Sequence, residues 1–95
     1  MRVVFHRHFF DDAAKLPSAV ADFVKKVVLT MENTSFVELS GAFDLLPLKG
    51  VKNGYRIRKG DYRILFTCEN NAIFLRKIVS RGQAYKKHNV AIIRL

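Results

Sequence analysis

Residues 55–66 read YRIRKGDYRILF, two alternating runs that meet at Gly60-Asp61. Glycine readily adopts the positive φ that the first central position of a two-residue hairpin turn needs, so the stretch predicts two antiparallel strands. Residues that lie opposite one another, or two apart along a strand, share a face of the sheet. The arginines of this hairpin are therefore expected together on one face: Arg56, Arg58 and Arg63.

A second hairpin is predicted directly after the first, with Asn70-Asn71 as its turn, because asparagine tolerates positive φ. This turn pairs Leu65 with Arg76 and Arg63 with Ile78, and it adds a fourth guanidinium to the same face. The three predicted strands cover residues 53–59, 62–68 and 73–80. No long connection separates them, so they should form an antiparallel meander.

The first half of the chain reads as a strand followed by helices. Residues 2–7 are β-branched and aromatic, which favours a strand. A short helix is expected from FFDDAAKL, with Asp11-Asp12 at its beginning, and apolar residues at helical spacing predict a helix over residues 17–32. Residues 36–50 are expected to form a loop or short turns. The fold class is therefore α+β in a single domain of residues 1–95, with the order β-α-α-β-β-β, two helices on one antiparallel sheet, and a short C-terminal segment.

The positive charge is concentrated in the second half of the chain. The net charge is +9, but residues 1–48 carry five basic and six acidic side chains, whereas residues 49–95 carry twelve and two. Clustering of this kind indicates a phosphate-bearing or acidic partner, and it is more than solubility requires.

Several classes of protein are disfavoured. The single cysteine, Cys68, cannot form an intrachain disulfide, which fits a reducing compartment. The sequence lacks an apolar run of about 18 residues and an export signal, so a cytoplasmic protein without membrane contact is expected. His6 and His8 would share a strand face but lack a third zinc ligand nearby in the sequence, and no metal or cofactor is expected.

The four arginines can be explained in two ways. They could extend over the sheet and pair with carboxylates, but only Asp61 and Glu69 lie near them in the sequence. Alternatively, they bind phosphate, which guanidinium groups do through paired hydrogen bonds. The shortage of nearby carboxylates favours a phosphate site.

The ordered motifs of this region resemble a known family. Residues 48–66, LKGVKNGYRIRKGDYRILF, and the later AIFLRKIVSRGQAYKK are similar to the RelE branch of the RelE/ParE toxin superfamily, small toxins of toxin–antitoxin pairs. The resemblance implies a metal-independent mRNA endonuclease that acts on the ribosome, in which the RNA 2′-hydroxyl attacks the adjacent phosphate. It also implies a cognate antitoxin as partner, with the toxin monomeric alone and hetero-oligomeric with the antitoxin.

The resemblance also suggests site residues. The catalytic candidates are Arg63, Arg81 and Tyr85, with Tyr85 as the acid or base. The candidates for binding RNA phosphates are Arg56, Arg58, Arg76, Lys49, Lys52, Lys59, Lys86 and Lys87.

Three positions differ from the pattern of the branch. Some members have lysines where Arg56 and Arg58 stand, and a histidine is common where this chain has Ser80. Because arginine and serine do not titrate near neutrality, proton transfer would fall to Tyr85 or to solvent. Two alternatives remain open: a ParE-like gyrase inhibitor without nuclease activity, and an inactive basic RNA-binding module.

Overall fold

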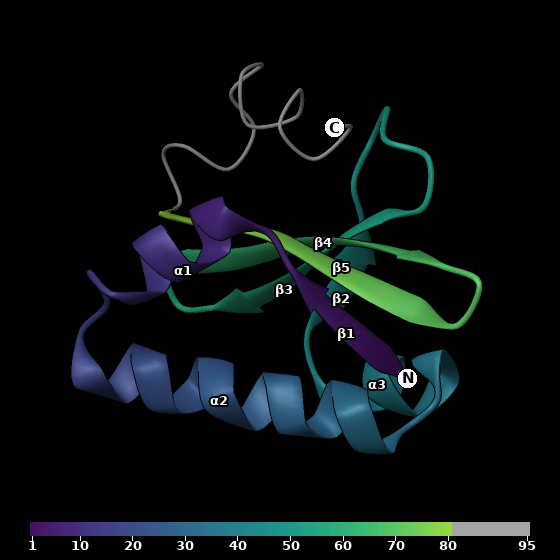
Figure 1. The fold of residues 1–95 in the computed structure, drawn as a ribbon, viewed down its shortest axis with the longest axis horizontal. Coiled ribbons are helices and arrows are strands. Elements are labelled where there is room, and N and C mark those ends of the chain that lie inside the picture. Colours follow the sequence, from purple (N-terminus) through teal and green to yellow (C-terminus); the bar gives the residue numbers. More distant parts are fainter. Residues whose placement is uncertain (81–95) are drawn as a thin grey trace.

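The computed structural model describes residues 1–80 of the chain, and these form an α+β fold (Figure 1). The helices are α1 (Arg7–Ala13), α2 (Ser18–Asn33) and α3 (Phe36–Ala42). The strands are β1 (Arg2–Phe5), β2 (Leu45–Pro47), β3 (Gly54–Lys59), β4 (Tyr62–Glu69) and β5 (Ala72–Ser80). They make one sheet in the order β1-β5-β4-β3-β2, in which β1 is parallel to β5 and the other neighbours are antiparallel.

The predicted fold class and the three-stranded meander are confirmed, with two differences. The sheet is mixed because β1 lies parallel to β5, and residues 36–50 contain both α3 and β2. Helix α3 begins with a capping box, in which Ser35 Oγ accepts from the N–H of Glu38 and Glu38 accepts from the N–H of Ser35. No helix in the described part of the chain is long and apolar enough to cross a bilayer.

Both hairpin turns have the predicted backbone. Gly60 has φ 56°, as the first central position of a type II′ turn requires, and Asn70 and Asn71 have φ 51° and 59°, as a type I′ turn requires. These two turns fix the pairs next to them, Lys59 with Tyr62 and Glu69 with Ala72.

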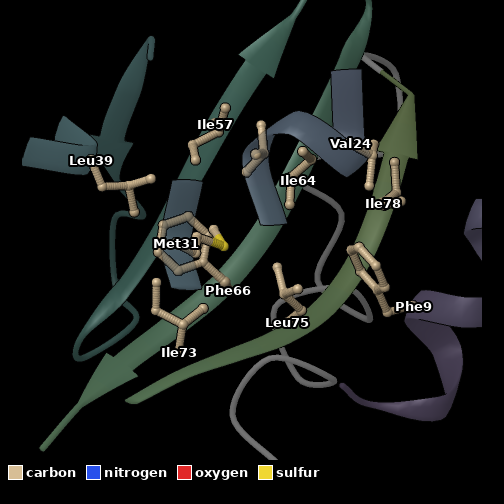
Figure 2. Packing of buried hydrophobic residues seen from close by; sticks show 11 residues of the cluster. Phe9, Val24, Met31, Leu39, Ile57, Ile64, Phe66, Ile73, Leu75 and Ile78 are labelled. Carbon is tan, nitrogen blue, oxygen red and sulfur yellow. The ribbon is translucent and has the colours of Figure 1, made fainter. Parts of the chain in front are cut away.

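The main core lies between the sheet and the helices (Figure 2). Val27 and Met31 of α2 and Leu39 of α3 are fully buried against the inward side chains of β3, β4 and β5, among which Phe66 is the largest. Figure 1 shows α2 running along one side of the sheet, so the opposite side is called the open face here.

The segment joining β2 and β3 covers part of the open face. Its Leu48 and Val51 pack on Leu65 and Val79 in a second, smaller apolar cluster. Gly54 follows this segment and lies beneath it: a Cβ atom at Gly54 would approach Val51 Cγ1 to 2.5 Å. The close contact explains why a residue without a side chain begins β3.

Gly54→Ala should therefore destabilise the protein. The added methyl group collides with a stiff, buried valine, and overpacking of this kind costs about 1–3 kcal/mol of unfolding free energy. Chemical denaturation would measure the change. Gly41→Ala is the matched control, because a Cβ there meets nothing within 4 Å. Equal stability of the two variants would contradict the expected contact.

Candidate nucleic-acid interface on the open face

Three of the predicted arginines lie together on the open face. The register of β3 and β4 pairs Arg58 with Arg63 and Arg56 with Leu65, as the sequence predicted. Ile57 and Ile64, which alternate with them, lie in the core against the helices. Arginines in this register face away from α2.

The register between β4 and β5 was predicted only in part. The first pairs after the turn are as expected, but a β-bulge next to Leu65 shifts the rest by one residue. Leu65 therefore pairs with Lys77, and Arg63 with Val79, so the predicted pairs with Arg76 and Ile78 were wrong. The bulge exists because Leu75 and Ile78, three residues apart, both belong to the core, which strict alternation cannot achieve. In the sequence, the two consecutive cations Arg76 and Lys77 interrupt the alternation of the strand and were the signal for this bulge.

Asp12 supports β5 at this irregular point. Its Oδ2 accepts a hydrogen bond of 2.9 Å from the N–H of Ile78, and its Oδ1 lies 3.2 Å from Nζ of Lys77. Strand β1 pairs with β5 only as far as Leu75, so the N–H of Ile78 lies at an edge of the sheet. The Asp12 carboxylate supplies the acceptor that this N–H would otherwise lack. Asp12 lies near the end of α1, so the expectation that Asp11-Asp12 begins a helix was wrong.

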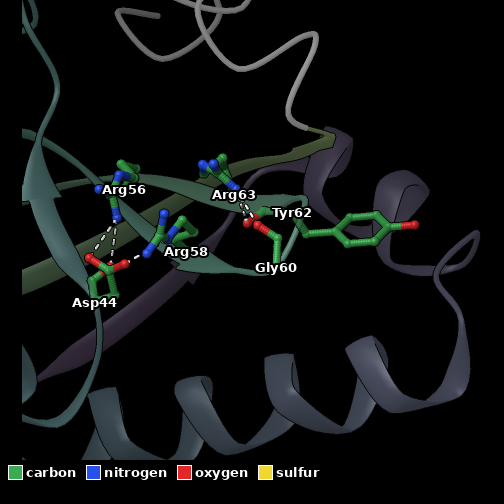
Figure 3. A network of polar contacts seen from close by, with 6 residues as sticks. All are labelled: Asp44, Arg56, Arg58, Gly60, Tyr62 and Arg63. Carbon is green, nitrogen blue, oxygen red and sulfur yellow. Dashed lines mark hydrogen bonds and ion pairs between the residues drawn. The ribbon is translucent and has the colours of Figure 1, made fainter.

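Asp44 is the site residue that the sequence analysis missed. Arg56 donates through Nη1 to the main-chain oxygen of Asp44 at 2.8 Å and to its Oδ1 at 3.1 Å, and Arg58 Nε lies 2.7 Å from Oδ2 (Figure 3). The hydrogen bond from Arg56, and after it the charges of Arg56 and Arg58, keep the pKa of the Asp44 carboxyl below its usual value. A carboxylate therefore neutralises part of the arginine cluster.

The two carboxylates weighed from the sequence do not pair with these arginines. Glu69 accepts a hydrogen bond from Asn53 Nδ2 at 3.1 Å, and Asp61 makes no ion pair among residues 1–80. Asp44 reaches the cluster because β2 pairs with β3 and places it beside Arg58. Reading residues 36–50 as a loop concealed this contact.

Arg56 and Arg58 differ in exposure although they share a partner. The side chain of Arg56 is 9% exposed, whereas that of Arg58 is 53% exposed. Arg56 is thus enclosed between Asp44 and the sheet, and Arg58 presents its guanidinium to solvent.

Arg63 holds the end of the hairpin. Its Nη1 donates to the main-chain oxygens of Gly60 at 2.8 Å and of Tyr62 at 3.1 Å, which places the guanidinium over the turn (Figure 3). It has no carboxylate partner among residues 1–80. Its charge is therefore balanced only by carbonyl dipoles within the described part of the chain.

Arg76 also lies on the open face. Its guanidinium carbon is 5.3 Å from the ring centroid of Phe74, and its Nη2 is 3.5 Å from Oγ1 of Thr67, which pairs with Phe74 across β4 and β5. Its Nε is buried without a hydrogen-bond partner among residues 1–80. Burial, and after it the charges of His8, Arg76 and Arg7, lower the pKa of the His6 imidazole.

The predicted lysines are divided among three places. Lys49 and Lys52 are exposed in the segment that crosses the open face. Lys59 lies on the other face, with Nζ 5.2 Å from the ring centroid of Phe23 on α2, so it does not join the arginines. The remaining candidates lie outside the described residues: Arg81, Tyr85, Lys86 and Lys87.

His6 and His8 stack with their ring centroids 4.8 Å apart. The Nδ1 of His6 accepts a hydrogen bond from the N–H of His8 and so caps the start of α1. Groups of three potential metal-ligating side chains do not occur within residues 1–80. The pair therefore has a local structural role.

Comparison with known proteins gives consistent relatives, although no family model matches the sequence. Toxin RelE3 of Methanocaldococcus jannaschii is 28% identical over 85 residues, which are 90% of this chain and 96% of that protein. The RelB–RelE antitoxin–toxin complex from Methanococcus jannaschii contains a chain that superposes with TM-score 0.77 and 27% identity, covering 86% of this chain and 94% of that one. The archaeal RelE–RelB complex from Pyrococcus horikoshii gives TM-score 0.69 and 26% identity, covering 87% and 97%.

Proposed function

This chain is a homologue of the RelE toxins, and on that premise we propose that it is the toxin of a toxin–antitoxin pair that inhibits translation by cutting mRNA on the ribosome. The observation that carries the proposal is the arginine cluster on the open face. Arg58, Arg63 and Arg76 lie on three neighbouring strands of the sheet, β3, β4 and β5. Within residues 1–80, the only carboxylate that pairs with any of them is that of Asp44.

The nucleophile of the proposed reaction belongs to the RNA itself. A 2′-hydroxyl loses its proton and attacks the adjacent phosphorus, and the 5′-oxygen of the next nucleotide leaves and takes up a proton. Negative charge grows on the phosphate oxygens as phosphorus becomes pentavalent. Fixed cations stabilise that charge more than they stabilise the ground state, and this is the strongest contribution that such a site can make.

The predicted site residues other than Lys59 have a place in this scheme. Arg63 and Arg81 stabilise the pentavalent phosphate, and Tyr85 exchanges the proton. Arg58 and Arg76 hold the RNA backbone on the sheet, with Arg56 supporting them from a more buried position. The lysines proposed to add long-range attraction are Lys49, Lys52, Lys86 and Lys87.

Expression of the chain without its antitoxin tests the proposal. Ribosome-bound mRNA should acquire new 5′ ends within codons, and co-expression of the antitoxin should remove them. Intact mRNA together with broken DNA would overturn the proposal in favour of gyrase inhibition. RNA binding without new ends and without growth arrest would assign the chain to inactive RNA-binding modules.

We expect the antitoxin to bind partly through charge. The solved RelB–RelE complexes are assemblies of an antitoxin with a toxin, and the second half of this chain would attract an acidic partner. The dissociation constant should therefore rise with salt, because exposed ion pairs are screened. Calorimetric titration at several salt concentrations would measure this. A constant affinity would instead indicate an apolar interface, such as the groove between α1 and α2 where Phe10 and Leu29 are 58% and 61% exposed.

A further inference from the structure

The contacts of Asp44 connect a buried arginine to an exposed one. Arg56 binds the main-chain oxygen and Oδ1 of Asp44, and the remaining carboxylate oxygen, Oδ2, binds Arg58 through Nε. The chain of contacts therefore runs from inside the sheet layer outward, from Arg56 through Asp44 to Arg58. Only Arg58, at its end, has more than half of its side chain exposed.

We propose that Asp44 is a positioning residue, which fixes the guanidinium of Arg58 in the orientation that receives an RNA phosphate. This proposal rests on the proposed function, because it takes an RNA phosphate as the ligand of Arg58. Arg56 then acts through Asp44: it fixes the carboxylate and leaves the phosphate to Arg58.

The position of Asp44 is itself fixed from both sides. Its neighbour Phe43 packs edge-to-face on Phe23 of α2, with ring centroids 5.6 Å apart, and Leu45 packs against the main core. The main-chain oxygen of Asp44 also accepts a hydrogen bond of 3.0 Å from the N–H of Arg58. A carboxylate anchored in this way can hold an arginine side chain in one rotamer, which a mobile surface acid cannot do.

The atom that Asp44 binds decides what Arg58 can still do. The contact with Asp44 uses Nε of Arg58. The two terminal amino groups of Arg58 make no hydrogen bond or ion pair within residues 1–80. Those groups form the end of the guanidinium fork, and a phosphate can accept from two of its donors at once. Holding the fork in place beforehand reduces the entropy that binding would otherwise lose.

The same carboxylate opposes RNA binding through its charge. A negative group within 2.7 Å of Arg58 Nε repels an approaching phosphate, so Asp44 lowers the affinity while improving the geometry. The two effects have opposite signs and can be separated. If Asp44 served only the fold, replacing it would lower RNA binding and cleavage together with stability.

Asp44→Asn is the test, because it removes the charge and keeps the shape and the main-chain oxygen. RNA binding by Asp44→Asn should be as tight as in the parent or tighter, while single-turnover cleavage on ribosomes falls, by up to ~10²-fold if the guanidinium moves by about 1 Å. Asp61→Asn is the matched control, since it makes the same charge change at an exposed turn residue. We expect the control to bind RNA as tightly as Asp44→Asn and to cleave at the parental rate.

A second measurement does not depend on activity. The Nε–H of Arg58 should give an NMR signal protected from solvent exchange in the parent and in Asp61→Asn, and this protection should be lost in Asp44→Asn. A parent that cuts no RNA would refute the proposed function, while the NMR comparison would still test the hold of Asp44 on Arg58. Parental cleavage by Asp44→Asn, or a loss of cleavage that only follows a lower melting temperature, would overturn the positioning role.

Discussion

Tyr85→Phe should slow mRNA cleavage by ~10²–10⁴-fold, the range that general acid–base catalysis contributes. The change deletes the hydroxyl and keeps the ring, so any stacking on a base is retained and RNA affinity should be unchanged. The proposed role of Tyr85 in proton transfer rests on the resemblance to RelE toxins. Arg56 and Arg58 cannot take over this role, because a guanidinium does not lose its proton at any working pH.

Single-turnover cleavage on programmed ribosomes, with RNA affinity measured in parallel, would check this expectation. Tyr55→Phe is the matched control, since the ring of Tyr55 packs between Phe36 and Phe66 on the core side of the sheet, away from the arginines. A folded Tyr85→Phe variant that cuts at the parental rate would contradict the proposed catalytic role of Tyr85. A loss of thermal stability in Tyr85→Ala, with normal cleavage by Tyr85→Phe, would show that the ring only packs.

The central part of the fold could be predicted because its information is local. Each hairpin is specified by two turn residues and by the alternation of the strands beside it, and Gly60, Asn70 and Asn71 adopt the positive φ expected of them. The shared face of Arg56, Arg58 and Arg63 follows from this register alone. For the same reason, α2 was predicted to within one residue at each end.

The parts that were missed depend on contacts between distant segments. Strand β2 has three residues and exists through its pairing with β3, and β1 joins β5 from the other end of the chain. The partner of the arginines is twelve residues upstream of Arg56, at a position whose role appears only when β2 is in place. Helix α3 and the bulge in β5 did have local signals, in the spacing of Ser35 and Glu38 and in the interrupted alternation at Arg76.

The arginines of the open face have different contacts, and we expect them to respond differently to substitution. Arg56 is buried and tied to Asp44, so replacing it should affect cleavage mainly through Arg58. Arg76 lies over Phe74 on β5, which β4 separates from β3, so we expect its replacement to act independently of Arg56 and Arg58. Arg63 combines two roles, since it holds the turn and lies directly opposite Arg58.

Arg63→Ala should lower the cleavage rate by ~10²–10³-fold, the effect of removing one fixed donor from a developing anion. Its lost hydrogen bonds to Gly60 and Tyr62 come from a charged donor and should reduce stability by about 1.5–3 kcal/mol each, so the melting temperature is measured together with the rate. Arg63→Lys keeps the charge without the planar fork and should recover RNA affinity more fully than rate.

A slower rate in Arg63→Ala could come from the lost hydrogen-bond donor, from the lost positive charge or from a destabilised hairpin. Lys26→Ala removes one exposed cation on α2, on the far side of the sheet from Arg63, and should leave the rate unchanged. Single-turnover rates, RNA affinities at two salt concentrations and melting temperatures would be measured for all three variants. If Arg63→Ala remains folded and cuts at the parental rate, Arg63 only supports the turn, and stabilisation of the pentavalent phosphate would have to come from Arg81 and Arg58.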